Sequence, residues 1–507
     1  MRVWTALSSL RGHRRLAAAA GFGVLSALAL PPVHALPVLL LAFPALLALL
    51  DNTTPRQALL VGFWFAIGHH LGGLYWITEA ILFDVAHFWW LVPIAVPLLA
   101  VVLSPFMALP CLLASRMPAG VSRVLVLVGG WTLMGLAQQF VATGFPWNLF
   151  GSVWAVPGAF GDVFIQPASL ISVHGLPLLT ILLACTPILG RRGLIGGATL
   201  LAVWAGFGFW QLSRPIPEGP DLTVVLVQGN ITQGQKSDHA FYVDSFRRYL
   251  GITEQGITEA AGKPTVVVWP ETASPFLIDS DPGARAAVAD SAAGPAMVGS
   301  LRFDDNHRLR NSLIAVYGPG PVPAFYDKWH LVPFGEYIPD WIPVSVKLLP
   351  GEGLAMGTGP ATLRMPGVPP AGALICYEAI FPGFVVNEAD RPDWMVNITN
   401  DSWFGNSSGP RQHLAAARMR AVEEGLPLMR AANTGISVGF DARGHELGRL
   451  GMGEQGVLLV QLPGKLPPPP FARFGLWIPL ALALLSLLAG LALRRHLIVN
   501  ARTPSMD

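Results

Sequence analysis

Residues 266–272 read VVVWPET, so that a short apolar segment runs directly into the carboxylate of Glu271. Residues 374–378 read LICYE and deliver the thiol of Cys376 in the same way. Short, mostly apolar runs are typical of strands that are buried on both faces. Because ligands in α/β sheets bind at the carboxyl ends of strands, we expect Glu271 and Cys376 to meet in one cleft.

Similar apolar runs recur between residues 213 and 470. Segments with apolar residues at helical spacing, 238–259 and 412–424, lie between some of them. Alternating strands and helices predict an α/β layered domain. The expected strands are 222–227, 265–268, 296–299, 312–317, 372–375, 394–398, 437–440 and 457–461.

A third segment, residues 326–336, reads YDKWHLVPFGE and adds Lys328. A thiol becomes a strong nucleophile when a carboxylate takes its proton, which predicts Cys376 as nucleophile and Glu271 as base and then acid. The ammonium of Lys328 would stabilise the oxyanion that forms on an acyl carbonyl. This chemistry requires no metal ion and no organic cofactor. Each residue alone has an ordinary interpretation, such as a packed core thiol or a surface ion pair, so the prediction depends on their combination.

The composition excludes a wholly soluble enzyme. Of 507 residues, 52% are hydrophobic and 13% are charged, whereas a soluble protein has about 25% charged residues. The formal net charge of +2 favours neither nucleic acid nor a strongly acidic partner. Three cysteines, Cys111, Cys185 and Cys376, form no disulfide framework and lack metal-ligand spacing.

The apolar residues are segregated along the chain. A membrane helix needs about 20 mostly apolar residues. We therefore expect a membrane bundle of about seven helices in residues 1–212, an α/β domain in 213–470, and a last membrane helix with a basic tail in 471–507. The eight expected spans are 16–30, 35–50, 57–78, 88–114, 124–143, 166–189, 193–210 and 475–493.

Positive charge alternates between the connections of these spans. Arginines occur before the first span, in the second, fourth and sixth connections, and after the last span. The first, third and fifth connections contain no lysine or arginine. Because positively charged loops stay in the cytoplasm, we expect both termini to be cytoplasmic and residues 213–470 to lie on the opposite face.

The combination of Glu271, Lys328 and Cys376 resembles the nitrilase, or carbon–nitrogen hydrolase, superfamily, whose fold is an α-β-β-α sandwich. Further motifs resemble the apolipoprotein N-acyltransferase family within it. They are VQGNI at 227–231, WPET at 269–272, the segment 328–336, CYE at 376–378, NDSWFG at 400–405, ARMRA at 417–421 and GFPW at 144–147.

The resemblance implies the substrates. Such enzymes move an acyl chain from a membrane phospholipid, through a cysteine thioester, to the α-amino group of an S-diacylglyceryl-cysteine that begins an apolipoprotein. It also implies a multi-pass protein of the bacterial inner membrane with a periplasmic catalytic domain. The lipid bilayer, the phospholipid donor and the lipoprotein acceptor are the expected partners, and nucleic acid is not.

The resemblance also implies supporting residues. Glu336 corresponds to a second essential glutamate that holds Lys328 or tunes its charge. Tyr377 would supply a backbone N–H to the oxyanion, and Glu378 would order the loop. Two aromatic residues, Trp403 and Phe404, are expected to line the lipid path, and plain packing is the alternative. Ser237 departs from the family pattern, which has a tryptophan after Lys236, and this puts the role of that tryptophan in doubt.

Two other functions are compatible with the same residues. A membrane-anchored amidase would hydrolyse C–N bonds with Glu271, Lys328 and Cys376, although a large membrane anchor is excessive for a small soluble substrate. A receptor that keeps the fold without catalysis is the third hypothesis, and the presence of all three residues argues against it.

Overall fold

The computed structural model describes residues 2–318, 320–341 and 353–502. The chain divides into two compact units, with boundaries between Ser213 and Arg214 and between Ala472 and Arg473. The first unit contains the N-terminal helices and the last helix, and the second unit contains all the strands. We refer to them as the helical unit and the catalytic unit.

The helical unit forms where the sequence is apolar. Each of the eight apolar segments contains a helix. Its main helices are α1 (Arg2–Ser9), α2 (Gly12–Ala27), α3 (Leu39–Leu49), α4 (Pro55–Leu74), α5 (Ile77–Leu82), α6 (Val85–Phe88), α7 (Ala95–Leu103), α8 (Pro105–Ser115), α9 (Val121–Phe140), α10 (Ala159–Ile165), α11 (Ala168–Ala184), α12 (Gly190–Ser213) and α18 (Trp477–Arg502).

The expected count of about eight membrane helices is not confirmed. Within the described residues, four helical stretches are long and apolar enough to cross a membrane. They are Ala95–Ser115, Val121–Phe140, Thr186–Ser213 and Trp477–His496. A fifth candidate is the pair α10 and α11, which is bent by 90°.

The remaining apolar segments fall short for visible reasons. The chain leaves the helical conformation near the Pro31-Pro32 pair, and α2 has 16 residues. The next apolar helix, Leu36–Leu49, is also shorter than a membrane span. Helix α4 has 20 residues, but His69, His70 and several glycines dilute its apolar character. Apolar composition therefore predicted a helix in each segment correctly, whereas the length and hydropathy of the described helices support four uninterrupted spans, or five if the bent pair is one span.

The catalytic unit contains two six-stranded sheets. The order of the first is β12-β1-β2-β3-β4-β5, and that of the second is β11-β10-β9-β8-β7-β6. In each sheet three neighbouring strands are parallel, β1 to β3 and β7 to β9, and antiparallel strands flank them. The strands are β1 (Thr223–Gln228), β2 (Thr265–Val268), β3 (Ala296–Phe303), β4 (Leu309–Val316), β5 (Phe325–Asp327), β6 (Thr362–Met365), β7 (Val368–Ile375), β8 (Trp394–Thr399), β9 (Leu428–Ala432), β10 (Ser437–Phe440), β11 (Glu446–Leu450) and β12 (Gly456–Gln461).

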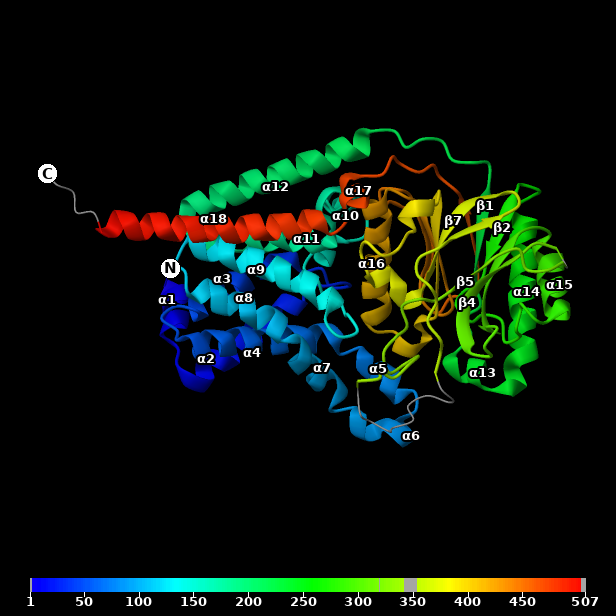
Figure 1. Ribbon diagram of the computed structural model, residues 1–507, viewed down its shortest axis with the longest axis horizontal. Helices are drawn as coiled ribbons and strands as arrows, with labels where there is room; N and C mark the ends of the chain where they lie inside the picture. The colour runs from blue at the N-terminus through cyan, green and yellow to red at the C-terminus, as the bar shows by residue number, and fades with distance from the viewer. Residues whose placement is uncertain (1, 319, 342–352, 503–507) are drawn as a thin grey trace. The chain divides into compact units, whose positions relative to one another are not determined.

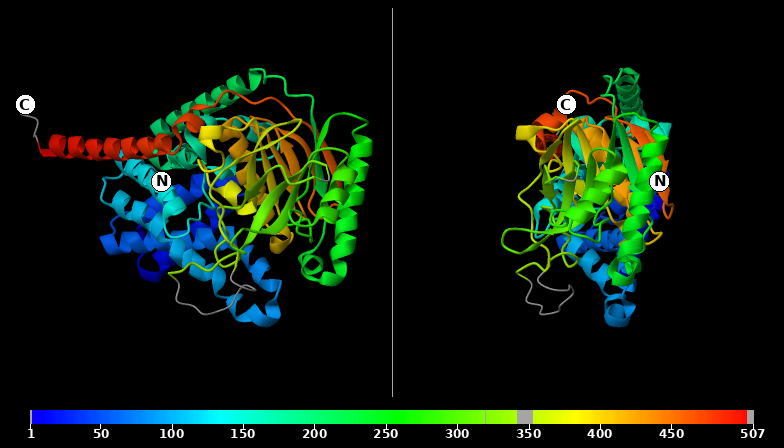
Figure 2. Two further views of the ribbon diagram at one scale, coloured as in Figure 1. Left: turned by 45° about the vertical axis from the view of Figure 1, so that its right-hand side comes forward. Right: turned by 90° about the vertical axis from the view of Figure 1, so that its right-hand side faces the viewer.

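The two sheets pack face to face between helices. Side chains such as Leu226, Val268 and Ile375 form the core between the sheets. Helices α14 (Tyr242–Glu259) and α15 (Pro282–Ala292) cover the outer face of the first sheet, and α16 (Gly409–Glu424) covers that of the second (Figure 1). The green α14 and α15 remain on one outer side of the strands in the turned views (Figure 2). This is the α-β-β-α sandwich that the resemblance to the nitrilase superfamily implies, and it fits the α/β layered domain predicted from the strand and helix pattern.

The predicted strands all occur, with boundaries shifted by a few residues. Four further strands, β5, β6, β9 and β11, were not predicted. Strand β9 contains the buried Arg430, so its sequence is not a continuous apolar run. Strand β11 alternates between partly buried and exposed residues, so it also lacks such a run. Strand β5 has only three residues, too few for a periodicity to emerge.

Candidate active site

Three strands deliver the residues that were expected to react. Glu271 lies in the turn that follows β2, after Trp269 and Pro270. Lys328 directly follows β5, and Cys376 directly follows β7. The thiol of Cys376 is close enough to Glu271 and Lys328 for both to influence its pKa. The two sheets thus bring the three residues together from widely separated parts of the sequence.

Lys328 lies between two carboxylates. Its Nζ donates to Oε1 of Glu271 at 3.2 Å and to Oε1 of Glu336 at 2.8 Å. Asn311, on β4, donates Nδ2 to the same two oxygens at 2.7 Å and 3.2 Å. We call these four residues the Lys328 cluster. Lys328 is 1% exposed, and a charge so deeply buried is tolerated only when it is paired. Although burial lowers the pKa of Lys328, the two carboxylates raise it well above its usual value.

Both oxygens of Glu271 are occupied by donors. Oε1 accepts from Asn311 and Lys328, and Oε2 accepts the backbone N–H of Asn400 at 2.8 Å. Burial alone would raise the pKa of Glu271, but Lys328, Asn311 and Lys236 outweigh it and hold that pKa below its usual value. Glu271 is therefore ionised at neutral pH and can accept a proton.

Cys376 occupies an unusual backbone conformation at the start of a 3-10 turn, Cys376–Ile380. Its φ of 51° lies in the left-handed region, which is costly for a residue with a side chain. Burial and then the charge of Glu271 raise the pKa of the thiol, whereas Lys328 and Thr399 oppose this increase. The resting site therefore holds a protonated thiol near an ionised carboxylate, which is the arrangement that general-base activation requires.

Glu378 is surrounded by a different set of donors. Its Oε1 accepts the hydroxyl of Tyr326 at 2.7 Å and the N–H groups of Trp329 and His330 at 2.8 Å and 3.3 Å. Its Oε2 accepts the N–H of Ile375 at 2.6 Å. Glu378 thus joins the loop after β5 to the end of β7, immediately next to the nucleophile.

Sequence reasoning missed three polar residues at this site. Asn311 lies within a strand and belongs to none of the quoted motifs. Lys236 was noted only as the neighbour of Ser237, yet its Nζ donates to the carbonyl of Glu271 at 3.0 Å and to Oγ1 of Thr272 at 2.7 Å. Burial lowers the pKa of Lys236 to about 8, although Glu271 and Cys376 act in the opposite direction. His413 lies on a helix that was predicted, but its position in that helix carried no signal.

Among the described residues, Cys376, Asp401 and His413 offer donor atoms within 4.8 Å of one another. Hydrogen bonds already engage this group, since Nδ1 of His413 lies 2.9 Å from Oδ1 of Asp401. The guanidinium of Arg430 contacts Oδ2 of Asp401 at 2.8 Å and Nδ1 of His413 at 3.2 Å. A cation so close to two of the three donors disfavours a metal ion, and the chemistry above needs none.

The other expected residues near this site, Tyr377, Trp403 and Phe404, contribute aromatic rings. The ring of Tyr377 is buried and packs at 5.1 Å from Phe381. Trp403 and Phe404 belong to the 3-10 turn Asp401–Phe404, where Trp403 is exposed and Phe404 is half-buried. The exposure of Trp403 leaves its indole surface accessible to an apolar ligand.

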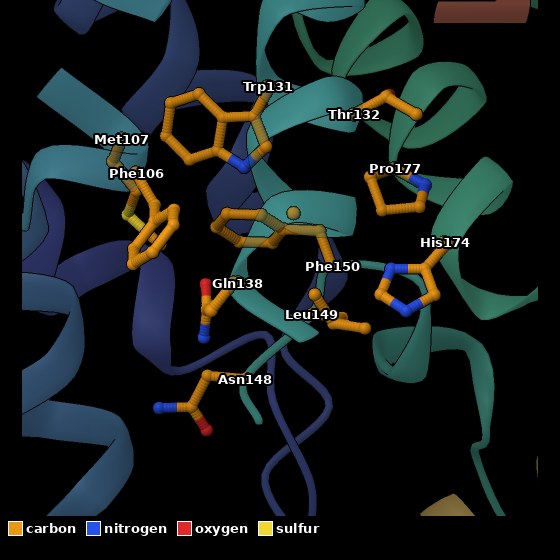
Figure 3. Close-up of a pocket in the computed structure, with 11 residues that line it drawn as sticks. Phe106, Met107, Trp131, Thr132, Gln138, Asn148, Leu149, Phe150, His174 and Pro177 are labelled. Carbon is orange, nitrogen blue, oxygen red and sulfur yellow. The ribbon is translucent and has the colours of Figure 1, made fainter. Parts of the chain in front are cut away.

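A small cavity in the helical unit is separate from these residues. It measures about 20 Å³, and its lining includes Trp131, Gln138, Phe150 and His174 (Figure 3). A space of this size holds about one water molecule. It is too small to bind an acyl chain.

Comparison with known proteins gives matches over both units. Residues 22–186 match the apolipoprotein N-acyltransferase N-terminal domain, and residues 223–466 match the carbon-nitrogen hydrolase family. An apolipoprotein N-acyltransferase of Bradyrhizobium diazoefficiens is 37% identical, and the match covers 96% of each chain. That of Rhizobium meliloti is also 37% identical, over 88% of this chain and 89% of the relative. Among solved structures, Saccharomyces cerevisiae Nit3, a member of the nitrilase superfamily, is 18% identical with a TM-score of 0.36, covering 50% of this chain and 92% of Nit3.

Proposed function

The chain belongs to the apolipoprotein N-acyltransferase family, and from this premise we propose that Glu271, Lys328 and Cys376 carry out its acyl transfer. It is an acyltransferase that acts on the amino terminus of lipoproteins. The observation that supports the assignment is the convergence of an ionised carboxylate, a buried ammonium and a protonated thiol in the catalytic unit. The donor is a membrane phospholipid, and the acceptor is an apolipoprotein that begins with S-diacylglyceryl-cysteine.

In the first step Cys376 takes the acyl chain. Glu271 accepts the thiol proton while sulfur attacks the ester carbonyl of the phospholipid, which forms a C–S bond and a tetrahedral oxyanion. Lys328 and the backbone N–H of Tyr377 stabilise that oxyanion. When it collapses, the ester C–O bond breaks, and Glu271 returns its proton to the oxygen of the departing lysophospholipid.

In the second step the thioester passes the chain to the lipoprotein. The neutral α-amine attacks the thioester carbonyl and loses a proton to Glu271, so that a C–N bond forms and the C–S bond breaks. The departing sulfur of Cys376 recovers that proton. Glu336 keeps Lys328 in place during both steps through its 2.8 Å contact, and Glu378 orders the loop that carries the nucleophile.

The membrane placement follows from the helical unit. The protein is a bacterial membrane protein, and the exposed apolar side chains of α12, such as Ile195, Val203 and Phe209, suit a lipid environment. We place both termini in the cytoplasm and the catalytic unit in the periplasm, because arginines alternate along the connections. Both substrates have acyl tails in the bilayer, so a site at the outer leaflet supplies proximity.

Intact-protein mass spectrometry tests this function. Purified enzyme is incubated with phosphatidylethanolamine, and the wild type should gain the mass of one acyl chain, removable by hydroxylamine. Cys376→Ala should gain nothing. Cys111→Ala and Cys185→Ala are matched controls, because these cysteines are also buried but lie in the helical unit, and both should be acylated normally.

A synthetic diacylglyceryl-cysteine peptide should then remove the acyl chain and gain its mass as an amide. Loss of the acyl chain to water at the same rate with and without the peptide would contradict the transferase assignment. Absence of any adduct combined with amide hydrolysis would support the membrane-anchored amidase instead.

A further inference from the structure

The peptide group between Cys376 and Tyr377 is held on its carbonyl side. Helix α16 packs against the 3-10 turn, and His413 on this helix lies with Nε2 2.9 Å from the carbonyl oxygen of Cys376. A carbonyl oxygen carries no proton, so Nε2–H is the donor. The carbonyl of Cys376 and the N–H of Tyr377 belong to one planar trans peptide group and point in opposite directions. Fixing the carbonyl therefore fixes the direction of the N–H.

His413 is itself held in one orientation. Its Nδ1 lies 2.9 Å from Asp401, whose other oxygen accepts from Arg430 at 2.8 Å. Burial would raise the pKa of Asp401, but Arg430 and His413 lower it to about 2, so the carboxylate is ionised. All three side chains are almost completely buried. The imidazole ring cannot turn without losing its hydrogen bond to the carbonyl of Cys376 and its close contact with Asp401 in a low-dielectric environment, where such losses are costly.

The backbone at Cys376 needs such support. A φ of 51° is unfavourable for a non-glycine residue and persists only when neighbouring contacts impose it. On the other side of Cys376, Glu378 holds the N–H of Ile375 at 2.6 Å. His413 is thus positioned to hold the peptide that follows the nucleophile, while Glu378 holds a peptide that precedes it.

We propose that His413 is a positioning residue that aims the N–H of Tyr377 at the oxyanion by holding the carbonyl of the same peptide group. The inference rests on the proposed function only through the role of that N–H. A hydrogen bond to the carbonyl also polarises the amide, which makes its N–H a stronger donor. His413 is almost completely buried and acts on the carbonyl of Cys376, so its effect is confined to steps that form an oxyanion.

The test compares two reactions of Cys376 in the full-length enzyme in detergent. Acylation by p-nitrophenyl octanoate forms a thioester through an oxyanion and releases p-nitrophenolate. Methyl methanethiosulfonate transfers its CH₃S group to the thiolate, forms a disulfide and releases methanesulfinate without any oxyanion. The first reaction needs the N–H of Tyr377, and the second needs only a reactive thiol.

The variants His413→Asn and His413→Gln form a matched pair. Both are polar amides, but asparagine is too short to reach the carbonyl of Cys376, whereas glutamine retains a donor within reach. His413→Asn should slow acylation about 100-fold, the scale for loss of one oxyanion donor, with little change in the disulfide reaction. His413→Gln should recover much of the acylation rate. His413→Leu takes the place of the asparagine variant if the latter does not fold.

A buried hydrogen bond elsewhere provides the control. Thr253 accepts from Nε1 of Trp269 at 2.8 Å on the outer side of the first sheet, and Thr253→Val should leave both reactions near wild-type rates. Equal slowing of both reactions in His413→Asn, or an acylation rate that does not change, would overturn the inference. Wild-type enzyme that accepts octanoate from the nitrophenyl ester but no chain from phospholipid would contradict the proposed function alone, and the variant comparison would still decide the role of His413.

Discussion

Two of the buried carboxylates in the catalytic unit, Glu271 and Glu378, differ in the kind of donor around them. Glu271 lies in the Lys328 cluster and faces an ammonium, an amide and one backbone N–H. Glu378 faces one hydroxyl and three backbone N–H groups, all of them neutral. Burial raises the pKa of Glu378 to about 7, whereas the cations near Glu271 overcome burial and hold its pKa below the usual value.

The difference in donors gives the two buried carboxylates different roles, one in catalysis and the other in structure. A carboxylate next to a lysine is stabilised through charge, so it remains an available base although it is buried. A carboxylate bound by backbone N–H groups ties two chain segments together, and its main contribution is to their geometry. We therefore expect substitutions at Glu271 to change rates most, and substitutions at Glu378 to change stability most.

Glu271→Gln should have the largest effect on rate. Loss of a general base costs roughly 10²–10⁴-fold, and here the same group serves in both half-reactions. The unfolding temperature should fall only modestly, because Glu336 still pairs with Lys328. Single-turnover thioester formation and differential scanning fluorimetry provide the two measurements. Glu254→Gln, on the exposed face of α14, is the control that should change neither.

Lys328→Met should affect both rate and stability. It removes an oxyanion donor, worth roughly 10²–10³-fold, and leaves Glu271 and Glu336 without the ammonium that bridges them, at about 3–5 kcal/mol in unfolding free energy. Lys328 is the largest charge that lowers the pKa of Glu271, so this pKa should rise in the variant.

The pH dependence gives a sharper test of Lys328→Met. In the wild type the depressed pKa of Glu271 contributes stability above its ordinary 4.5, and that contribution is lost as pH falls through the folded value. In the variant Glu271 is protonated more easily, so the stability deficit of the variant should shrink from pH 8 to pH 5. A stability deficit of Lys328→Met that is the same at pH 8 and pH 5 would show that charge pairing does not distinguish Glu271 from Glu378. Lys465→Met, which breaks the exposed pair with Asp393, should cost under about 1 kcal/mol.

The sequence predicted the part of the site that depends on strand ends. Glu271 and Cys376 each follow a short valine-, leucine- or isoleucine-rich strand, and residues at the carboxyl ends of such strands are expected to bind ligands. The two strands, β2 and β7, belong to different sheets, so the two residues come together because the sheets pack face to face. Asn311 and His413 could not be found in this way, because one lies inside an antiparallel strand and the other inside a buried helix. Their roles depend on contacts between the sheets and α16 that no local pattern records.

The helical unit shows a second limit of prediction from the sequence. Apolar composition identified eight helical segments, but whether a segment runs unbroken depends on single residues. In α11 the backbone of Ser172 leaves the helical conformation at φ 63°, and Pro177 follows shortly afterwards. Hydropathy averages over such breaks, so it does not show whether an apolar segment forms one continuous helix.

Glu378→Gln should reduce stability more than it reduces the rate. The four donors leave no acceptor for an amide NH₂, so one end of glutamine must face an N–H group or the hydroxyl of Tyr326. An unsatisfied buried donor costs about 1–3 kcal/mol. Thermal unfolding and the thioester assay measure the two effects, with the exposed Glu388→Gln as control. A stable variant without activity would contradict the structural role and place Glu378 beside Glu271 in the chemistry.

Tyr326→Phe should have the smallest effect on stability and rate. The pH dependence of its cost in stability tests whether Glu378 titrates. The hydroxyl of Tyr326 lowers the pKa of Glu378, so its removal should raise that pKa further from its value of about 7. A carboxyl whose folded pKa exceeds its ordinary 4.5 binds its proton more tightly in the folded state, and the protein loses stability as pH rises towards the folded value. The cost of the substitution should therefore be about 1 kcal/mol at pH 5, where Glu378 is protonated, and roughly 1.5–3 kcal/mol at pH 8.5, where the lost bond is to a charged group.

Chemical unfolding of Tyr326→Phe at these two pH values, with the exposed Tyr317→Phe as control, measures this difference. A cost that does not grow with pH would mean that Glu378 does not titrate in this range, and that neutral donors stabilise its anion as effectively as Lys328 stabilises that of Glu271. The rate of thioester formation should remain within a few-fold of wild type at both pH values, because Tyr326 acts on the loop and not on the reacting atoms. A loss of rate that follows the loss of stability across pH would instead show that the order of the loop at Cys376 limits the reaction.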